Sequence, residues 1–212
     1  MVVLESGMSL DTVVEVNVDS RTMYGSSVMG LEPGDRVTVR DLLYGLMLPS
    51  GNDAAIALGR AVSGSDAAFV AEMNAFAARL GLSDTHFTNP HGLTARDHYS
   101  SAYDLAVLSR YAMANPTFAE IAGADEWLVL APRPIQLRNV NLFLQYPGGD
   151  GVKTGFTNRA GKTVIASAQR DGRRIYVVLL NAPNREQDAA ALMDWAFNNS
   201  VPSLNASAAA LR

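Results

Sequence analysis

Residues 163–180 read Thr-Val-Ile-Ala-Ser-Ala-Gln-Arg-Asp-Gly-Arg-Arg-Ile-Tyr-Val-Val-Leu-Leu, and this stretch decides the fold class. Residues 163–169 and 173–180 are rich in β-branched and apolar side chains, which predicts two strands. Asp171-Gly172 between them is a signal for a tight hairpin turn. The last third of the chain is therefore predicted to contain an antiparallel pair of strands.

Helical patterns surround this hairpin. Capping signals and apolar periodicity predict helices over residues 38–48, 54–62, 65–80, 101–115 and 185–197. Shorter strand-like segments lie at 12–18 and 127–130, and residues 20–37 and 83–100 are predicted loops. This alternation predicts a mixed α and β domain of the α+β class.

Three helix starts carry specific capping signals. Thr38 with Asp41, and Ser101 with Asp104, have the spacing of a capping box. Asn52 or Asp53 is expected to cap the helix over 54–62. The length of 212 residues predicts one domain over 1–200, followed by an Ala- and Ser-rich tail, 201–212, that we expect to be frayed.

Composition excludes several function classes. The net charge is -4 and no long basic run occurs, so nucleic acid is not an expected partner. The absence of cysteine excludes disulfides, thiol nucleophiles and Cys-zinc sites, and no metal or cofactor is predicted. The N-terminus has no basic region before its apolar run, and it does not read as a signal peptide.

Ser50-Gly51-Asn52 is the first motif that can carry chemistry. It follows a helix-stopping proline, Pro49, and opens the next helix. On its own it is common turn and capping chemistry, and that plainer interpretation is favoured for so short a match.

Lys153-Thr154-Gly155 is the second motif, within Gly148-Gly-Asp-Gly-Val-Lys-Thr-Gly. At the start of a strand, the lysine and threonine can place an ammonium group and a hydroxyl group beside a cleft. The glycine would let a ligand lie close to the strand backbone. A phosphate-binding loop is rejected, because residue 152 is Val rather than Gly and a strand-rich hairpin follows.

Taken together, the two motifs resemble those of the penicillin-recognising serine enzymes, in the D-alanyl-D-alanine carboxypeptidase branch. The resemblance extends over residues 1–197 and includes Gly25-Ser-Ser-Val-Met, Leu48-Pro-Ser-Gly-Asn-Asp-Ala-Ala, Thr85-His-Phe-Thr-Asn-Pro-His-Gly-Leu, Tyr99-Ser-Ser-Ala-Tyr-Asp-Leu and Gly151-Val-Lys-Thr-Gly-Phe-Thr-Asn-Arg-Ala-Gly. A β-lactamase relative is a further alternative, but Gly51 stands where an aspartate is more typical.

The resemblance implies a β-lactamase/transpeptidase-like fold, in which an antiparallel sheet packed with helices lies beside a helical subdomain. It implies a serine acyl-enzyme reaction that removes the terminal D-alanine from peptidoglycan stem peptides. The implied inhibitors are β-lactam antibiotics. The implied location is extracytoplasmic, in the periplasm or on the outer face of the bacterial membrane.

The resemblance also assigns roles to individual residues. Ser50 would relay protons, and Asn52 would hydrogen-bond the substrate backbone. Lys153, Thr154 and Arg185 would bind the substrate carboxylate, in a motif completed by Gly155. Arg185 could equally be a surface residue at a helix start. The backbone N–H of Phe156 would be an oxyanion donor, whereas His91 is given no catalytic role.

The nucleophile motif of the family is missing. The two lysines, Lys153 and Lys162, are preceded at three residues by Asp150 and Arg159, so no Ser-x-x-Lys occurs. The chain is either a fragment of a longer protein or an inert binder of peptidoglycan peptides. We expect a fragment, because the other motifs are intact.

The expected fragment would lack the first strands of the family's sheet and its nucleophile helix. The strand over 173–180 would then be an exposed apolar edge, and the core would contain a void or a collapsed region. We therefore expect this chain to be aggregation-prone or only partly folded.

Overall fold

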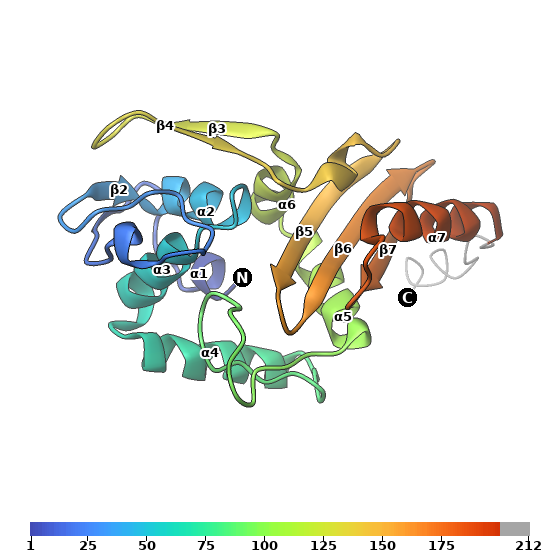
Figure 1. The fold of residues 1–212 in the computed structure, drawn as a ribbon, viewed down its shortest axis with the longest axis horizontal. Coiled ribbons are helices and arrows are strands. Elements are labelled where there is room, and N and C mark those ends of the chain that lie inside the picture. The colour runs from blue at the N-terminus through green and yellow to red at the C-terminus, as the bar shows by residue number, and fades with distance from the viewer. Residues whose placement is uncertain (200–212) are drawn as a thin grey trace, which may run out of the picture.

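The structure, a computed structural model, describes residues 1–199 and has two parts that lie side by side (Figure 1). One part is an antiparallel sheet with the strand order β5-β6-β7, and the other is a helical subdomain. The sheet consists of β5 (Gly149–Thr157), β6 (Gly161–Arg170) and β7 (Arg173–Leu179). The predicted fold class is confirmed, and the predicted tail over 201–212 lies outside the described residues.

The predicted hairpin is β6-β7. Ser167 pairs with Tyr176 in its antiparallel register. Asp171 has a φ of 49° and Gly172 a φ of 74°, as a two-residue turn between right-handed twisted strands requires.

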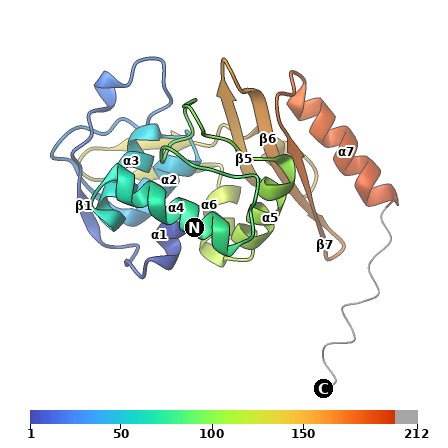
Figure 2. The same cartoon turned by 90° about the horizontal axis from the view of Figure 1, so that it is seen from below.

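Helices cover both faces of this sheet. Figure 2 shows α7 (Arg185–Asn199) on one side of the strands and α5 (Ala102–Met113) on the other. Met193 of α7 is fully buried and belongs to the same apolar cluster as Val177 of β7. On the opposite face, Tyr176 packs against the cluster that contains Met113. Because helices cover both faces of the sheet, β7 can have apolar side chains on both of its faces.

The helical subdomain contains most of the other elements. Its helices are α1 (Val2–Glu5), α2 (Val39–Met47), α3 (Asn52–Ser63), α4 (Asp66–Arg79) and α6 (Pro116–Gly123), with the 3-10 turn η1 (Ser20–Thr22). Its short strands are β1 (Val13–Glu15), β2 (Arg36–Thr38), β3 (Glu126–Val129) and β4 (Ile135–Arg138). A second 3-10 turn, η2 (Leu142–Gln145), packs with the sheet, since its Phe143 lies in the same apolar cluster as Val164 of β6. Within residues 1–199 no single helix is long and apolar enough to span a membrane, although α3 and α4 meet that test as a pair bent by 86°.

The β3-β4 hairpin lies over α2 (Figure 1). The Trp127 ring stacks on Tyr44 of α2, with ring centroids 4.0 Å apart. Its Nε1 atom donates a hydrogen bond of 2.8 Å to Asp41 Oδ1. A stacked pair with a satisfied indole N–H fixes the hairpin on the helix.

The sequence analysis did not predict α6, β2 or β4. The prediction treated Asn115-Pro116 as the end of a helix. Instead, Asn115 caps α6 by accepting from Phe118 N, and Pro116 occupies its first turn. Proline suits that position because its missing N–H would have no partner there.

The expected position of β7 at the edge of the sheet is confirmed, whereas the expected void in the core stays a prediction. Within residues 1–199, β7 pairs with β6 alone. An apolar cavity of about 260 Å³ lies between α1, α2, α4 and α5, with Phe69, Met73 and Phe76 in its wall. Aggregation of the chain stays a prediction.

Candidate active site

A cleft of about 530 Å³ lies between β5 and the helical subdomain. It brings together every residue that the sequence analysis placed in the site: Ser50, Asn52, Lys153, Thr154, Gly155, Phe156 and Arg185. The first two come from the helical wall, and the others come from β5 and the start of α7. The two motifs therefore face one cleft, while the roles assigned to their side chains stay predictions.

On the helical wall, the predicted cap of α3 is wrong. Gly51 is the N-cap residue, and Asn52 is already helical. The Asn52 side chain instead donates to Ser26 Oγ, and its backbone N–H donates to Ser27 O at 2.9 Å. Asn52 thus joins the start of α3 to the loop over residues 25–31.

The turn before α3 is tightly built. Ser50 has a φ of 64°, in the left-handed region that non-glycine residues rarely occupy. A Cβ atom on Gly51 would come within 2.6 Å of Gly45 O, so only glycine fits there. This backbone places Ser50 in the cleft wall.

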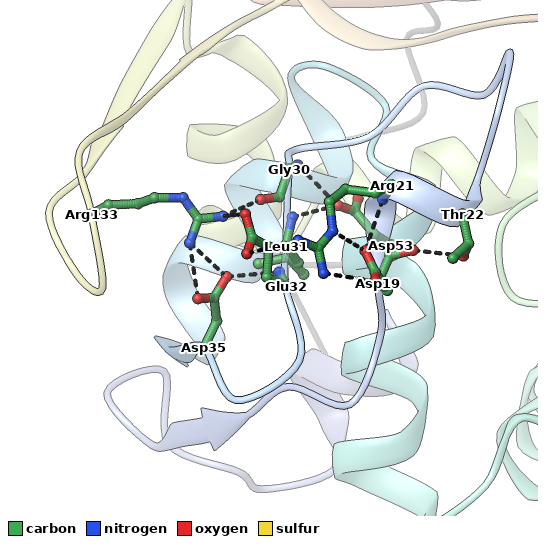
Figure 3. Close-up of polar contacts among 9 residues, drawn as sticks. All are labelled: Asp19, Arg21, Thr22, Gly30, Leu31, Glu32, Asp35, Asp53 and Arg133. Atoms are coloured by element: carbon green, nitrogen blue, oxygen red, sulfur yellow. Dashed lines mark hydrogen bonds and ion pairs between the residues drawn. The ribbon is translucent and has the colours of Figure 1, made fainter.

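Asp53 lies behind this wall, and the sequence analysis considered it only as a possible helix cap. It is fully buried, and its carboxylate accepts backbone N–H groups of Met29, Gly30 and Leu31, each at 2.9 Å. Figure 3 shows the carboxylate against the backbone of Gly30 and Leu31. Three N–H donors compensate a buried carboxylate well, so Asp53 fixes the loop that carries Ser26. Its donors lie 22–24 residues away in sequence, which no local pattern indicates.

Arg133 fixes the same loop from the β3-β4 turn. Its guanidinium donates to both Asp35 carboxylate oxygens, at 2.9 and 3.1 Å, and to Gly30 O at 2.5 Å (Figure 3). Asp35 is buried, so this ion pair is partly shielded from water. The loop is thus held from two directions.

On the opposite wall, Lys153 is a cation without a carboxylate partner among residues 1–199. Its Nζ atom donates to Thr154 O at 3.0 Å. Burial, with a smaller contribution from the nearby Arg185 charge, lowers the pKa of Lys153 to about 8. A partly buried ammonium group with no counterion among the described residues is available to an anionic ligand.

Gly155 also lies close to the adjacent strand, since a Cβ atom there would lie 2.7 Å from Thr163 Oγ1 on β6. The close approach of a ligand to this glycine stays a prediction. Gly155 nevertheless lines the cleft.

Arg185 is the first residue of α7 and lies on the cleft wall, with a side chain that is 16% exposed, while its role in binding a carboxylate stays a prediction. Its Nη1 atom donates to Gly155 O at 2.8 Å and to Thr163 O at 3.1 Å. Its Nε atom donates to Glu186 Oε1 at 2.6 Å. These bonds fix the guanidinium beside β5 and add positive charge to the cleft.

The loop over 83–100 forms part of the rim of the cleft. His91 lines the cleft, and its Nδ1 atom accepts from Leu93 N at 3.2 Å. Burial, and then the charge of His98, lower the pKa of His91. Thr94 Oγ1 lies 2.8 Å from Thr157 Oγ1, which joins this loop to β5.

Comparison with known proteins gives consistent matches. A family profile described as D-alanyl-D-alanine carboxypeptidase, peptidase S11, matches residues 1–184. The chain is 36% identical to D-alanyl-D-alanine carboxypeptidase DacF of Bacillus subtilis, over 93% of this chain and 52% of that protein. It is 40% identical to D-alanyl-D-alanine carboxypeptidase DacB2 of Mycobacterium tuberculosis, over 90% of this chain and 68% of that protein. The chain spans about half the length of the first curated relatives that it matches.

Solved structures give the same result. The Streptomyces K15 DD-transpeptidase has a TM-score of 0.86 at 33% identity, over 93% of this chain and 83% of that one. Penicillin-binding protein 6B from Escherichia coli has a TM-score of 0.86 at 39% identity, over 96% and 68% of the two chains.

Proposed function

The chain belongs to the D-alanyl-D-alanine carboxypeptidase family, and we propose that its cleft binds peptidoglycan stem peptides ending in D-Ala-D-Ala for a serine acyl-enzyme reaction. The supporting observation is the meeting of Asn52 with Lys153, Thr154 and Arg185 across one cleft. The two cations and the hydroxyl suit a terminal carboxylate, and the amide suits a peptide backbone. We place the reaction outside the cytoplasm, where peptidoglycan is assembled.

In this proposal the two walls have separate tasks. Lys153, Thr154 and Arg185 hold the terminal carboxylate, and the Phe156 N–H polarises the carbonyl that is attacked. Asn52 orients the peptide, and Ser50 relays a proton to the leaving amine.

The covalent step needs a nucleophile that these residues do not supply. The 212 residues contain no Ser-x-x-Lys, so we propose that this chain by itself binds the peptide without cleaving it. In a form that carries the motif, the serine would attack and its lysine would accept the proton. β-Lactams would acylate that form and not this chain.

Labelling with a fluorescent penicillin tests the covalent part of the proposal. No labelled band should survive denaturing electrophoresis, because losing the nucleophile of a comparable serine enzyme costs on the order of a million-fold in turnover. Penicillin-binding protein 6B from Escherichia coli serves as the positive control. A stable band on this chain that disappears in Ser50→Ala would mean that Ser50 acts as nucleophile, contrary to the proposal.

NMR titration tests the binding part. An N-acylated D-Ala-D-Ala peptide should shift the backbone amides of Lys153, Thr154 and Phe156 and the side-chain amide of Asn52. The L-Ala-L-Ala peptide is the matched control ligand and should shift them much less. Equal shifts with both peptides, or none with either, would contradict the proposed function.

A further inference from the structure

The turn between β3 and β4 contacts the loop that supports Asn52, although none of the cleft-lining residues within 1–199 belongs to this turn. Arg133 lies in the turn, and Figure 3 shows its side chain extended toward Gly30 and Asp35. Its guanidinium donates to Gly30 O at 2.5 Å and to the two carboxylate oxygens of Asp35 at 2.9 and 3.1 Å. These bonds join positions that lie 98 and 103 residues apart in the chain.

The backbone of Gly30 is bound on both of its sides. Its carbonyl accepts from Arg133, and its N–H donates to Asp53 Oδ2 at 2.9 Å. Asp35 extends the contact, because its Oδ2 atom also accepts from the N–H of Glu32 at 2.8 Å. Gly30 has a φ of 98°, and glycine has little conformational preference of its own. The bonds from Arg133 and to Asp53 therefore determine the course of the loop at this point.

The same loop carries the two acceptors that hold Asn52. The Asn52 side-chain amide donates to Ser26 Oγ, and its backbone N–H donates to Ser27 O at 2.9 Å. Both serines line the cleft together with Asn52. Two residues separate Ser27 from Gly30, so a displacement at Gly30 reaches both acceptors through a short stretch of backbone. A displacement of about 1 Å is enough to misalign a group that orients a ligand.

A second arginine near this loop has a different arrangement. Arg21 pairs with Asp19 at 2.8 Å and with Glu32 at 3.5 Å, and its side chain is 65% exposed. Within residues 1–199 its guanidinium forms no bond to the loop over residues 25–31. The side chain of Asp35, the partner of Arg133, is only 9% exposed. An exposed ion pair constrains the backbone little, whereas an arginine bound to both oxygens of a shielded carboxylate fixes their relative geometry.

We infer that Arg133 is a positioning residue, which fixes the loop over residues 25–31 from outside the cleft and thereby orients the Asn52 side chain toward a bound peptide. The bond to Ser26 uses the Asn52 nitrogen and leaves its Oδ1 atom to accept from a peptide N–H. The peptide-binding part of this inference rests on the proposed function. The position of Asn52 in the ligand-free chain does not rest on it and is measured separately.

NMR of the ligand-free 212-residue chain tests the positioning. Arg133→Gln keeps a polar side chain but removes the charged fork, so the side-chain amide signals of Asn52 should shift and exchange faster with water. Arg133→Lys keeps the charge without the planar fork and should restore these signals in part. Arg21→Gln is the matched control and should leave them unchanged, because its ion pairs do not reach the loop over residues 25–31.

Peptide affinity tests the consequence for the cleft. An N-acylated D-Ala-D-Ala peptide should bind Arg133→Gln about five- to tenfold more weakly than the wild-type chain, which is the effect of one misdirected hydrogen bond. In an Asn52→Ala background the same substitution should have no further effect, since no side-chain amide remains to be oriented. A general loosening of the fold would instead weaken binding in both backgrounds.

The outcomes separate the inference from the proposed function. If the peptide binds neither the wild-type chain nor any variant, the proposed function is wrong, and the Asn52 signals still decide whether Arg133 positions that side chain. If the peptide binds and Arg133→Gln leaves either the Asn52 signals or the affinity unchanged, the proposed function stands and the inference is wrong. An equal loss of affinity in the Asn52→Ala background, or equal signal shifts in Arg21→Gln, would also overturn the inference.

Discussion

The two walls of the cleft each contain a charged side chain shielded from water, fully buried Asp53 on one wall and partly buried Lys153 on the other, and the two differ in their hydrogen-bond partners. On the helical wall, the Asp53 carboxylate accepts three backbone N–H groups of residues 29–31. On the sheet wall, the Lys153 ammonium group has one carbonyl partner, and burial lowers its pKa to about 8. The anion is satisfied by the fold, whereas the cation is left for a ligand.

This difference separates residues that build the site from residues that use it. Removing Asp53 would leave several backbone donors unpaired, so its effect should appear in folding. Removing Lys153 would relieve a desolvated charge, so its effect should appear in binding and not as a loss of stability.

The largest expected effect is on the helical wall. Asp53→Ala should lower the free energy of unfolding by about 3–5 kcal/mol, because it leaves three buried N–H groups without an acceptor. Thermal or urea denaturation measures this loss, and faster hydrogen exchange at Met29, Gly30 and Leu31 would locate it.

Asp11→Ala is the control for that variant. The Asp11 side chain is 81% exposed and pairs with Arg40 at 3.3 Å. Its removal should change stability by less than about 1 kcal/mol. Similar losses in the two variants would contradict the structural role of Asp53.

The next effect has the opposite sign. Lys153→Met should raise the free energy of unfolding by about 1–3 kcal/mol, because an uncharged side chain replaces a desolvated ammonium group. The pKa of Lys153 is about 8 in the fold against an ordinary 10.5. The unfolded chain therefore binds more protons between these values, and the wild-type chain should gain stability as pH rises from about 8 to 10.5.

Denaturation at pH 7 and at pH 10 measures both consequences. In Lys153→Met the gain between these two pH values should be smaller than in the wild-type chain. A variant that is less stable than wild type at pH 7 would mean that Lys153 supports the fold.

A smaller effect is expected in the pH dependence of binding. Since the ammonium form attracts a carboxylate, affinity for a D-Ala-D-Ala peptide should be full below pH 8 and should fall as pH rises through about 8. One pH unit above that pKa, the loss approaches about tenfold if only the charged form binds.

Titrations from pH 7 to 9.5 stay above the lowered pKa of His91. Lys153→Arg keeps its charge over this range, so its affinity should not change with pH. The same pH dependence in both proteins would assign the titrating group elsewhere.

The sequence predicted the parts of this contrast that are local. Asp171-Gly172 indicated the β6-β7 hairpin because a two-residue turn of this kind needs positive φ angles at its two central residues, and Asp171 and Gly172 have them. Thr38 and Ser101 indicated helix starts, and each does accept a backbone N–H three residues later. The two motifs indicated which residues would meet at the cleft.

The structural features that the sequence did not predict mostly depend on residues that are distant in the chain. Asn52 or Asp53 was expected to cap α3, but the Asp53 carboxylate accepts from Ala54 N and from three N–H groups of a loop more than 20 residues upstream. The strands β2 and β4 have three and four residues, too few for a clear alternating pattern. Pro116 was taken as a stop because a proline after a helix and a proline in a first turn look alike in sequence.

The smallest effect expected concerns the contact that joins the two walls at the rim. Thr94 and Thr157 are linked through their hydroxyl oxygens at 2.8 Å, and both lie at the surface. Thr94→Val keeps the side-chain shape and removes the bond, so stability should fall by only about 0.5–1 kcal/mol. Because the bond attaches the loop over 83–100 to β5, ligand binding should weaken more than stability does, by roughly threefold for a diacetyl-lysyl-D-Ala-D-Ala peptide.

Thr88→Val on the same loop is the control, since Thr88 contacts His98 within the loop and not β5. A binding loss in Thr88→Val as large as that in Thr94→Val would mean that the rim depends on the loop's own conformation and not on its attachment to the strand.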